Sequence, residues 1–125
     1  MGDAEFEDII AGAIEDLPEE FRDKLSNVAI IAADFPTGEQ MQVLAKRGEK
    51  GLLLGLYQGI PQTKRRSYGV GPTLPDKITI FKYPLLRISG SYEEARKNIK
   101  DTVIHEIAHH FGMNEEEIKK AKGRL

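Results

Sequence analysis

The stretch His105-Glu106-Ile107-Ala108-His109 decides how the chain is organised, and it lies inside a long amphipathic segment near the C-terminus. Successive residues of an α-helix are turned by about 100°, so the two histidines lie roughly 40° and one turn apart on one face. Two imidazoles at this spacing can bind one metal ion, and the glutamate between them can act on a water beside it. All three histidines of the chain lie within six residues, which argues against a chance arrangement.

The apolar residues around the histidines predict that the same helix packs on a core. They lie on one continuous arc, which comprises Val103, Ile104, Ile107, Ala108 and Phe111. With this arc buried, the histidines would border a cleft. The alternative is that they are ordinary polar residues on an exposed helix face.

The bounds of this helix follow from its capping residues. Ser91 is a favourable N-cap, and Glu94 three residues later completes a capping box. Gly112 suits the left-handed position that ends a helix. The sequence therefore predicts a helix from about residue 92 to residue 111.

Other segments of the chain alternate between helical and extended patterns, which indicates an α+β fold with one domain over residues 1–125. The expected elements are helices over 3–16, 19–25, 39–46 and 115–122, strands over 27–33, 51–57 and 77–82, a long loop over 58–75, and a turn or helical start over 83–88. Strict alternation in 77–82 predicts a strand with one solvated face.

Two histidines do not complete a catalytic zinc site, which usually has three protein ligands. The motif can extend to H-E-x-x-H-x-x-G-x-x-H, in which a glycine turns the chain and the last residue reaches back to the metal. Here Gly112 occupies the glycine position and Glu115 the last position. We therefore expect His105, His109 and Glu115 as metal ligands, with Glu116 as a lesser candidate for the third. Helix-dipole stabilisation is the other explanation for glutamates at this helix start.

Four kinds of role are considered for the other polar residues: general base, orienting residue, helix-end residue and oxyanion donor. Glu106 is the expected general base, since a carboxylate beside the metal can take a proton from water. Asp101 could orient an imidazole ligand, although simple solvent exposure is an equal alternative. His110 is turned about 100° from His109, and a histidine near a helix C-terminus is favoured by the dipole. The candidates for stabilising an oxyanion are Tyr57, Tyr68, Tyr83, Tyr92, Arg65 and Arg66.

Composition narrows the class of protein. The chain has 125 residues, a net charge of −2 and no cysteine. This charge gives no reason to expect nucleic acid as a partner, and the lack of cysteine excludes thiolate ligands. No signal peptide or membrane span is visible, so the expected protein is cytoplasmic and does not bind membranes. It is expected to be a monomer or a weak oligomer.

Three stretches of the chain resemble the minimal zincin-like metallopeptidase family of small bacterial proteins. They are residues 17–30, residues 54–63, and residues 74–81 followed by 103–113. The resemblance implies a compact zincin fold, in which a small mixed β-sheet lies against an active-site helix and an edge strand lines the cleft. It also implies a metal ligand at position 115, where the family often has Asp; Glu115 is one methylene longer.

These expectations combine into one functional prediction. The protein would be a zinc-dependent metallopeptidase that binds one Zn²⁺ ion and hydrolyses peptide bonds with a metal-activated water. The peptide or protein substrate would lie along the 77–82 strand as a further strand of the sheet. One alternative is a catalytically inactive module of zincin fold that binds a metal or a peptide. Another is a metal with a purely structural role.

Overall fold

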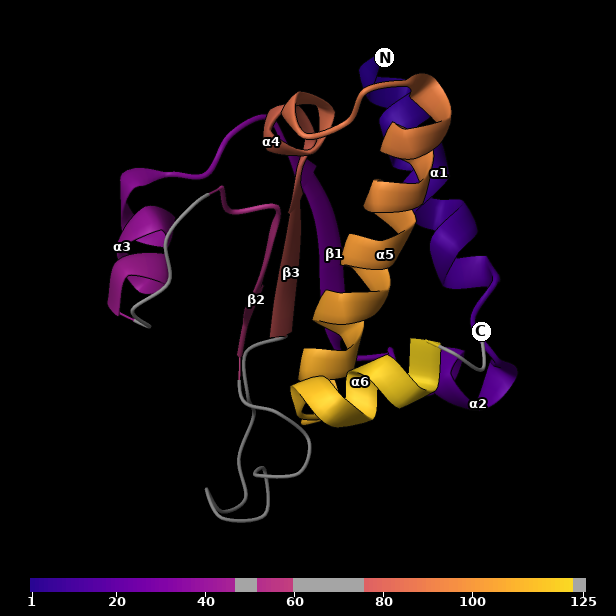
Figure 1. The fold of residues 1–125 in the computed structure, drawn as a ribbon. Coiled ribbons are helices and arrows are strands. Elements are labelled where there is room, and N and C mark those ends of the chain that lie inside the picture. Colours follow the sequence, from indigo (N-terminus) through magenta and orange to yellow (C-terminus); the bar gives the residue numbers. More distant parts are fainter. Residues whose placement is uncertain (47–51, 60–75, 123–125) are drawn as a thin grey trace.

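The structure is a computed structural model, and it describes residues 1–46, 52–59 and 76–122. Its helices and strands follow the chain in this order: α1 (Asp3–Glu15), α2 (Glu19–Arg22), β1 (Val28–Ala33), α3 (Gly38–Lys46), β2 (Gly55–Gln58), β3 (Asp76–Phe81), α4 (Lys82–Arg87), α5 (Tyr92–His110) and α6 (Glu115–Lys122) (Figure 1). The predicted α+β class is therefore confirmed.

The three strands form one mixed sheet in the order β1-β3-β2. β3 is parallel to β1, with Val28 opposite Asp76, and antiparallel to β2, with Tyr57 opposite Ile78. β3 is thus the central strand. The prediction that 77–82 is an edge strand available to a peptide is wrong, because both of its edges are hydrogen-bonded to neighbouring strands. Among the described residues, the outer edges of the sheet belong to β1 and β2.

Helices lie on both faces of this sheet. α1 and α5 pack side by side on one face, while α3 lies on the opposite side (Figure 1). Ile78 and Ile80 of β3 point into the larger core beneath α1 and α5. Phe81 points the other way and packs with Leu56 and Val43. β3 is therefore buried on both faces except at Lys77, and the predicted solvated face is wrong for this strand.

Most other element predictions agree with the structure to within one or two residues, and two differ more. The second strand begins only at Gly55, because residues 52–54 have no strand pairing, and α2 ends at Arg22 instead of residue 25. The predicted loop over 58–75 lies mostly outside the described residues. Within the described residues, the helices are too short or too polar to cross a membrane.

Candidate metal centre

The long helix α5 carries the histidine motif, and Ser91 is its N-cap, as predicted. The Ser91 side chain accepts a hydrogen bond from the Glu94 backbone N–H at 3.1 Å. Ile99, Val103 and Ile107 then bury one face of the helix against the sheet and α1. This packing leaves His105 and His109 half-buried on an adjacent face.

The two histidines and the glutamate between them converge. One ligand atom from each of His105, Glu106 and His109 can be chosen so that all three lie within 4.8 Å of one another. The two imidazole rings have centroids 4.7 Å apart and planes inclined by 75°. In a tetrahedral zinc site with bonds of about 2.1 Å, two ligand atoms lie about 3.4 Å apart, so side-chain rotations would have to draw these atoms together for both rings to bind one ion. The donor set of imidazole nitrogen and carboxylate oxygen fits zinc.

A cleft of about 310 Å³ opens beside this group. Its lining combines residues just before and at the start of β2 with one face of α5: Leu54, Gly55, Asp101, Thr102, His105 and Glu106. Glu106 is only 8% exposed, whereas its neighbour His105 is half-buried. Asp101 thus lies in the same cleft as His105. The cleft runs next to β2, which is an outer strand of the sheet.

The chain turns sharply after the second histidine. The helix ends at His110, and Gly112 has φ of 75°, a left-handed conformation that favours glycine. The Gly112 N–H donates to the His109 carbonyl at 2.9 Å, and the Met113 N–H to the Ala108 carbonyl at 3.1 Å. These two bonds form a Schellman motif. The prediction of a left-handed glycine at the helix end is confirmed.

The turn leads directly into α6, whose first residue is Glu115. Asn114 and Glu117 exchange the two hydrogen bonds of a capping box, at 2.8 and 3.2 Å, as predicted. Glu117 therefore has a structural role. The side chain of Glu115 lies outside the described part of the structure, so its assignment as the third ligand stays a prediction.

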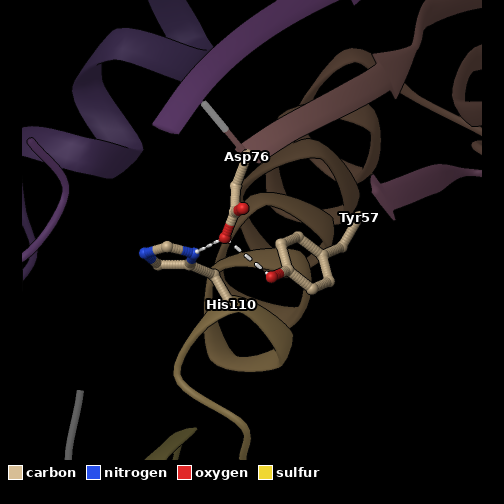
Figure 2. Close-up of polar contacts among 3 residues, drawn as sticks. All are labelled: Tyr57, Asp76 and His110. Atoms are coloured by element: carbon tan, nitrogen blue, oxygen red, sulfur yellow. Dashed lines mark hydrogen bonds and ion pairs between the residues drawn. The ribbon is translucent and has the colours of Figure 1, made fainter. Parts of the chain in front are cut away.

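A buried network that the sequence did not predict lies beside the metal motif. The Asp76 carboxylate oxygen Oδ2 accepts a hydrogen bond from the Tyr57 hydroxyl at 2.7 Å and lies 2.7 Å from His110 Nδ1 (Figure 2). Asp76, Tyr57 and His110 are 2%, 8% and 1% exposed, respectively. His110 is therefore fixed by a specific partner as well as by its place at the helix end.

This network also removes one candidate for the oxyanion donor, because the Tyr57 hydroxyl is directed at Asp76. Among the other candidates, Tyr83 stacks on Phe35 with ring centroids 5.0 Å apart. Tyr92 is the first residue of α5. Tyr92 precedes His105 by 13 residues, or about 20 Å of helix, so it is too far away to act there. The other three candidates, Arg65, Arg66 and Tyr68, lie outside the described residues.

Comparisons with known proteins identify the family and a similar fold. A family model described as zincin-like metallopeptidase matches residues 25–124. A solved structure of a conserved hypothetical protein from T. thermophilus superimposes with a TM-score of 0.56 and 21% identity. That alignment covers 99% of this chain and 100% of the other, and at this identity it supports the fold alone. The comparison with curated proteins gives no match.

Proposed function

Because the chain belongs to the zincin-like metallopeptidase family, we propose that it is a zinc-dependent peptidase. His105 and His109 are the proposed zinc ligands, Glu115 the third ligand, and Glu106 the general base. The observation that supports this most is the convergence of imidazole and carboxylate atoms within 4.8 Å at the edge of a cleft. A zinc ion held there would acidify water and polarise a substrate carbonyl.

The proposed task of Glu106 is to move a proton. Its carboxylate takes a proton from the attacking water and later delivers it to the amine that leaves. Its carboxylate group lies in the lining of the cleft next to His105, which is where a water beside the metal would stand.

We propose that the peptide substrate lies along the outer edge of β2, in place of the 77–82 strand. β2 borders the cleft through Gly55, and among the described strands it pairs only with β3. An extended peptide can hydrogen-bond to such a free edge as an added strand. This position would bring a peptide carbonyl next to His105 and Glu106.

Two variants test the proposed roles. His109→Ala should lose about one equivalent of bound zinc, measured by metal analysis of protein purified without a histidine tag. Glu106→Gln should keep its zinc but lower cleavage of a fluorogenic peptide library by a factor of about 10² or more. Glu93→Gln is the matched control, because it makes the same change at an exposed position in the first turn of α5.

The outcomes separate the proposed peptidase from its alternative. Unchanged zinc content in His109→Ala would contradict the metal site. Undiminished hydrolysis by Glu106→Gln would remove this residue from the mechanism. If the zinc-loaded wild type cleaves no peptide of a broad library, the protein is better described as a binding module of zincin fold.

A further inference from the structure

The buried network of Tyr57, Asp76 and His110 joins the sheet to the last turn of α5. Asp76 is the first residue of the central strand, and its backbone N–H donates to the Asn27 carbonyl at 3.1 Å. Tyr57 belongs to the neighbouring strand β2, and His110 is the last residue of α5. The network therefore connects three elements at a single carboxylate oxygen (Figure 2).

The surroundings hold the Asp76 carboxylate in place. A β-carbon at Gly59 would lie only 2.5 Å from Asp76 Cγ, so the backbone at position 59 lies against the carboxylate. Asp76 and His110 are almost completely buried, at 2% and 1% exposure. Separating such a buried pair would leave both side chains without this hydrogen bond and shielded from water. The free-energy cost of that state keeps the pair together.

The last turn of α5 needs such a constraint if it is to bind a metal. The Schellman bonds satisfy the carbonyls of Ala108 and His109, but they join this turn only to the residues that follow it and do not tie it to the sheet. A rotation of about 10° about the helix axis moves a side chain at a radius of about 5 Å by roughly 1 Å. Metal–ligand distances tolerate only about 0.2 Å. His105 lies a full turn further into the helix, whereas His109 lies in this last turn.

We propose that Asp76 and His110 are positioning residues, which fix the orientation of the last turn of α5 and thereby aim His109 at the metal. His109 and His110 are consecutive, so a rotation of this turn that moves His109 also moves the His110 ring and strains its 2.7 Å contact with Asp76. This inference rests on the proposed metal site. It assigns to Asp76, 34 residues before His110 in the chain, a role in metal binding without making it a ligand.

Zinc affinity, measured by competition with a chromophoric chelator, is the first test. His110→Ala should weaken zinc binding by about 10- to 100-fold, the range expected when a residue that orients a ligand is lost. His110→Asn should restore affinity to within a few-fold of wild type, because the Asn amide nitrogen is as many bonds from Cα as His Nδ1. Ile99→Ala is the matched control, since it removes a fully buried side chain from the middle of the same helix.

The positioning role predicts effects that a general loss of stability would not produce. Ile99→Ala should lower stability but keep zinc affinity and the visible spectrum of the Co²⁺-loaded protein. His110→Ala should change that spectrum, because it reports the geometry of the ligands. In metal-free protein, His110→Ala should also speed amide hydrogen exchange at Phe111, Gly112 and Met113 relative to the rest of the helix.

Tyr57→Phe keeps the proposal testable if His110→Ala does not fold, because it removes a single hydrogen bond from Asp76. It should weaken zinc binding several-fold and speed exchange in the same turn. Unchanged affinity and exchange in Tyr57→Phe, together with wild-type affinity in His110→Ala where that variant folds, would overturn the positioning role. Equal losses of affinity in Ile99→Ala and His110→Ala would also overturn it. A wild type that binds no zinc would overturn the metal site itself.

Discussion

Gly55 of β2 faces Thr102 of α5 so closely that a β-carbon at position 55 would lie 2.8 Å from Thr102 Cγ2. The same β-carbon would lie 3.1 Å from Cγ of Glu106. Glycine thus allows the strand to approach the helix at the wall of the cleft. Glycine is required at position 55 because a side chain has no room there, and not because of its backbone torsion angles.

Gly55→Ala should therefore push β2 away from α5 and displace Glu106. We expect a loss of about 1–3 kcal/mol in the free energy of unfolding, as for other overpacked sites, and weaker peptide hydrolysis. Chemical denaturation and peptide cleavage measure the two effects. Gly12→Ala in α1 is the control, because nothing lies within 4 Å of its added β-carbon, and it should stabilise by up to about 1 kcal/mol.

The steric cause can be checked with a double variant. Thr102→Ala removes the methyl group that the new β-carbon would meet, so Gly55→Ala should cost less in that background. An equal cost in both backgrounds would show that contact with Thr102 is not the cause.

Glu115→Gln should weaken zinc binding by at least about tenfold, since it replaces an anionic oxygen ligand with a neutral amide. Gly112 turns the chain three residues earlier and brings the start of α6 just after the histidine helix. Glu116→Gln, with the same change at the next residue, is the control and should keep wild-type affinity. Reversed results for the two variants would transfer the third-ligand role to Glu116.

Thr79 offers a stabilising substitution in the central strand. Its hydroxyl is buried, and no hydrogen-bond partner for it exists among the residues that the structure describes. Thr79→Val should raise the free energy of unfolding by about 1 kcal/mol, because it removes a polar group buried without compensation and retains the β-branched shape. Thermal or urea unfolding would measure the gain.

Thr102→Val is the corresponding control. The Thr102 hydroxyl donates to the Asn98 carbonyl at 2.8 Å, so its replacement by a methyl group should bring no gain. A loss of stability in Thr79→Val would mean that the Thr79 hydroxyl is satisfied in solution.

The ion pair between Lys82 and Asp3 predicts a pH dependence of stability. Lys82 Nζ lies 2.7 Å from the Asp3 carboxylate, whose hydrogen bond raises the pKa of Lys82, while burial partly opposes the rise. A raised lysine pKa stabilises the fold below the unfolded-state value of about 10.4, and this contribution disappears as the pH rises through the folded-state pKa.

Asp3→Asn should accordingly lower stability at neutral pH and become equal to wild type at strongly alkaline pH. Unfolding midpoints measured from about pH 7 to about pH 12 would show the convergence. Glu5→Gln removes another carboxylate from the first turn of α1 and controls for the helix dipole. A wild-type advantage that persists at the highest pH would contradict the role of the ion pair.

Local patterns predicted the helices well because their causes are local. Ser91, Gly112 and the Asn114–Glu117 pair cap helices with partners only a few residues away, and the sequence therefore predicts the bounds of α5 and α6. The spacing of His105 and His109 likewise follows from helix geometry alone.

Sheet order and the buried network depend on contacts between distant segments. Alternation in 77–82 predicted one solvated face, but Phe81 on that face packs with Leu56 and Val43. The resemblance implied an edge strand, but β1 and β2 take both edges. Asp76 and His110 are 34 residues apart, and no local pattern links a carboxylate before a strand to a histidine at a helix end. Such a pair can be identified only when the three-dimensional positions of the strands and the helix are known.

The central position of β3 has a consequence for how the protein is made. β3 pairs with β1, whose residues lie far earlier in the chain, and with β2, so it is the last of the three strands to leave the ribosome. Until it emerges, β1 and β2 lack their partner in the sheet and expose backbone groups that can pair with other chains. Pairing with β3 can therefore shield these backbone groups only after residues 76–81 have left the ribosome.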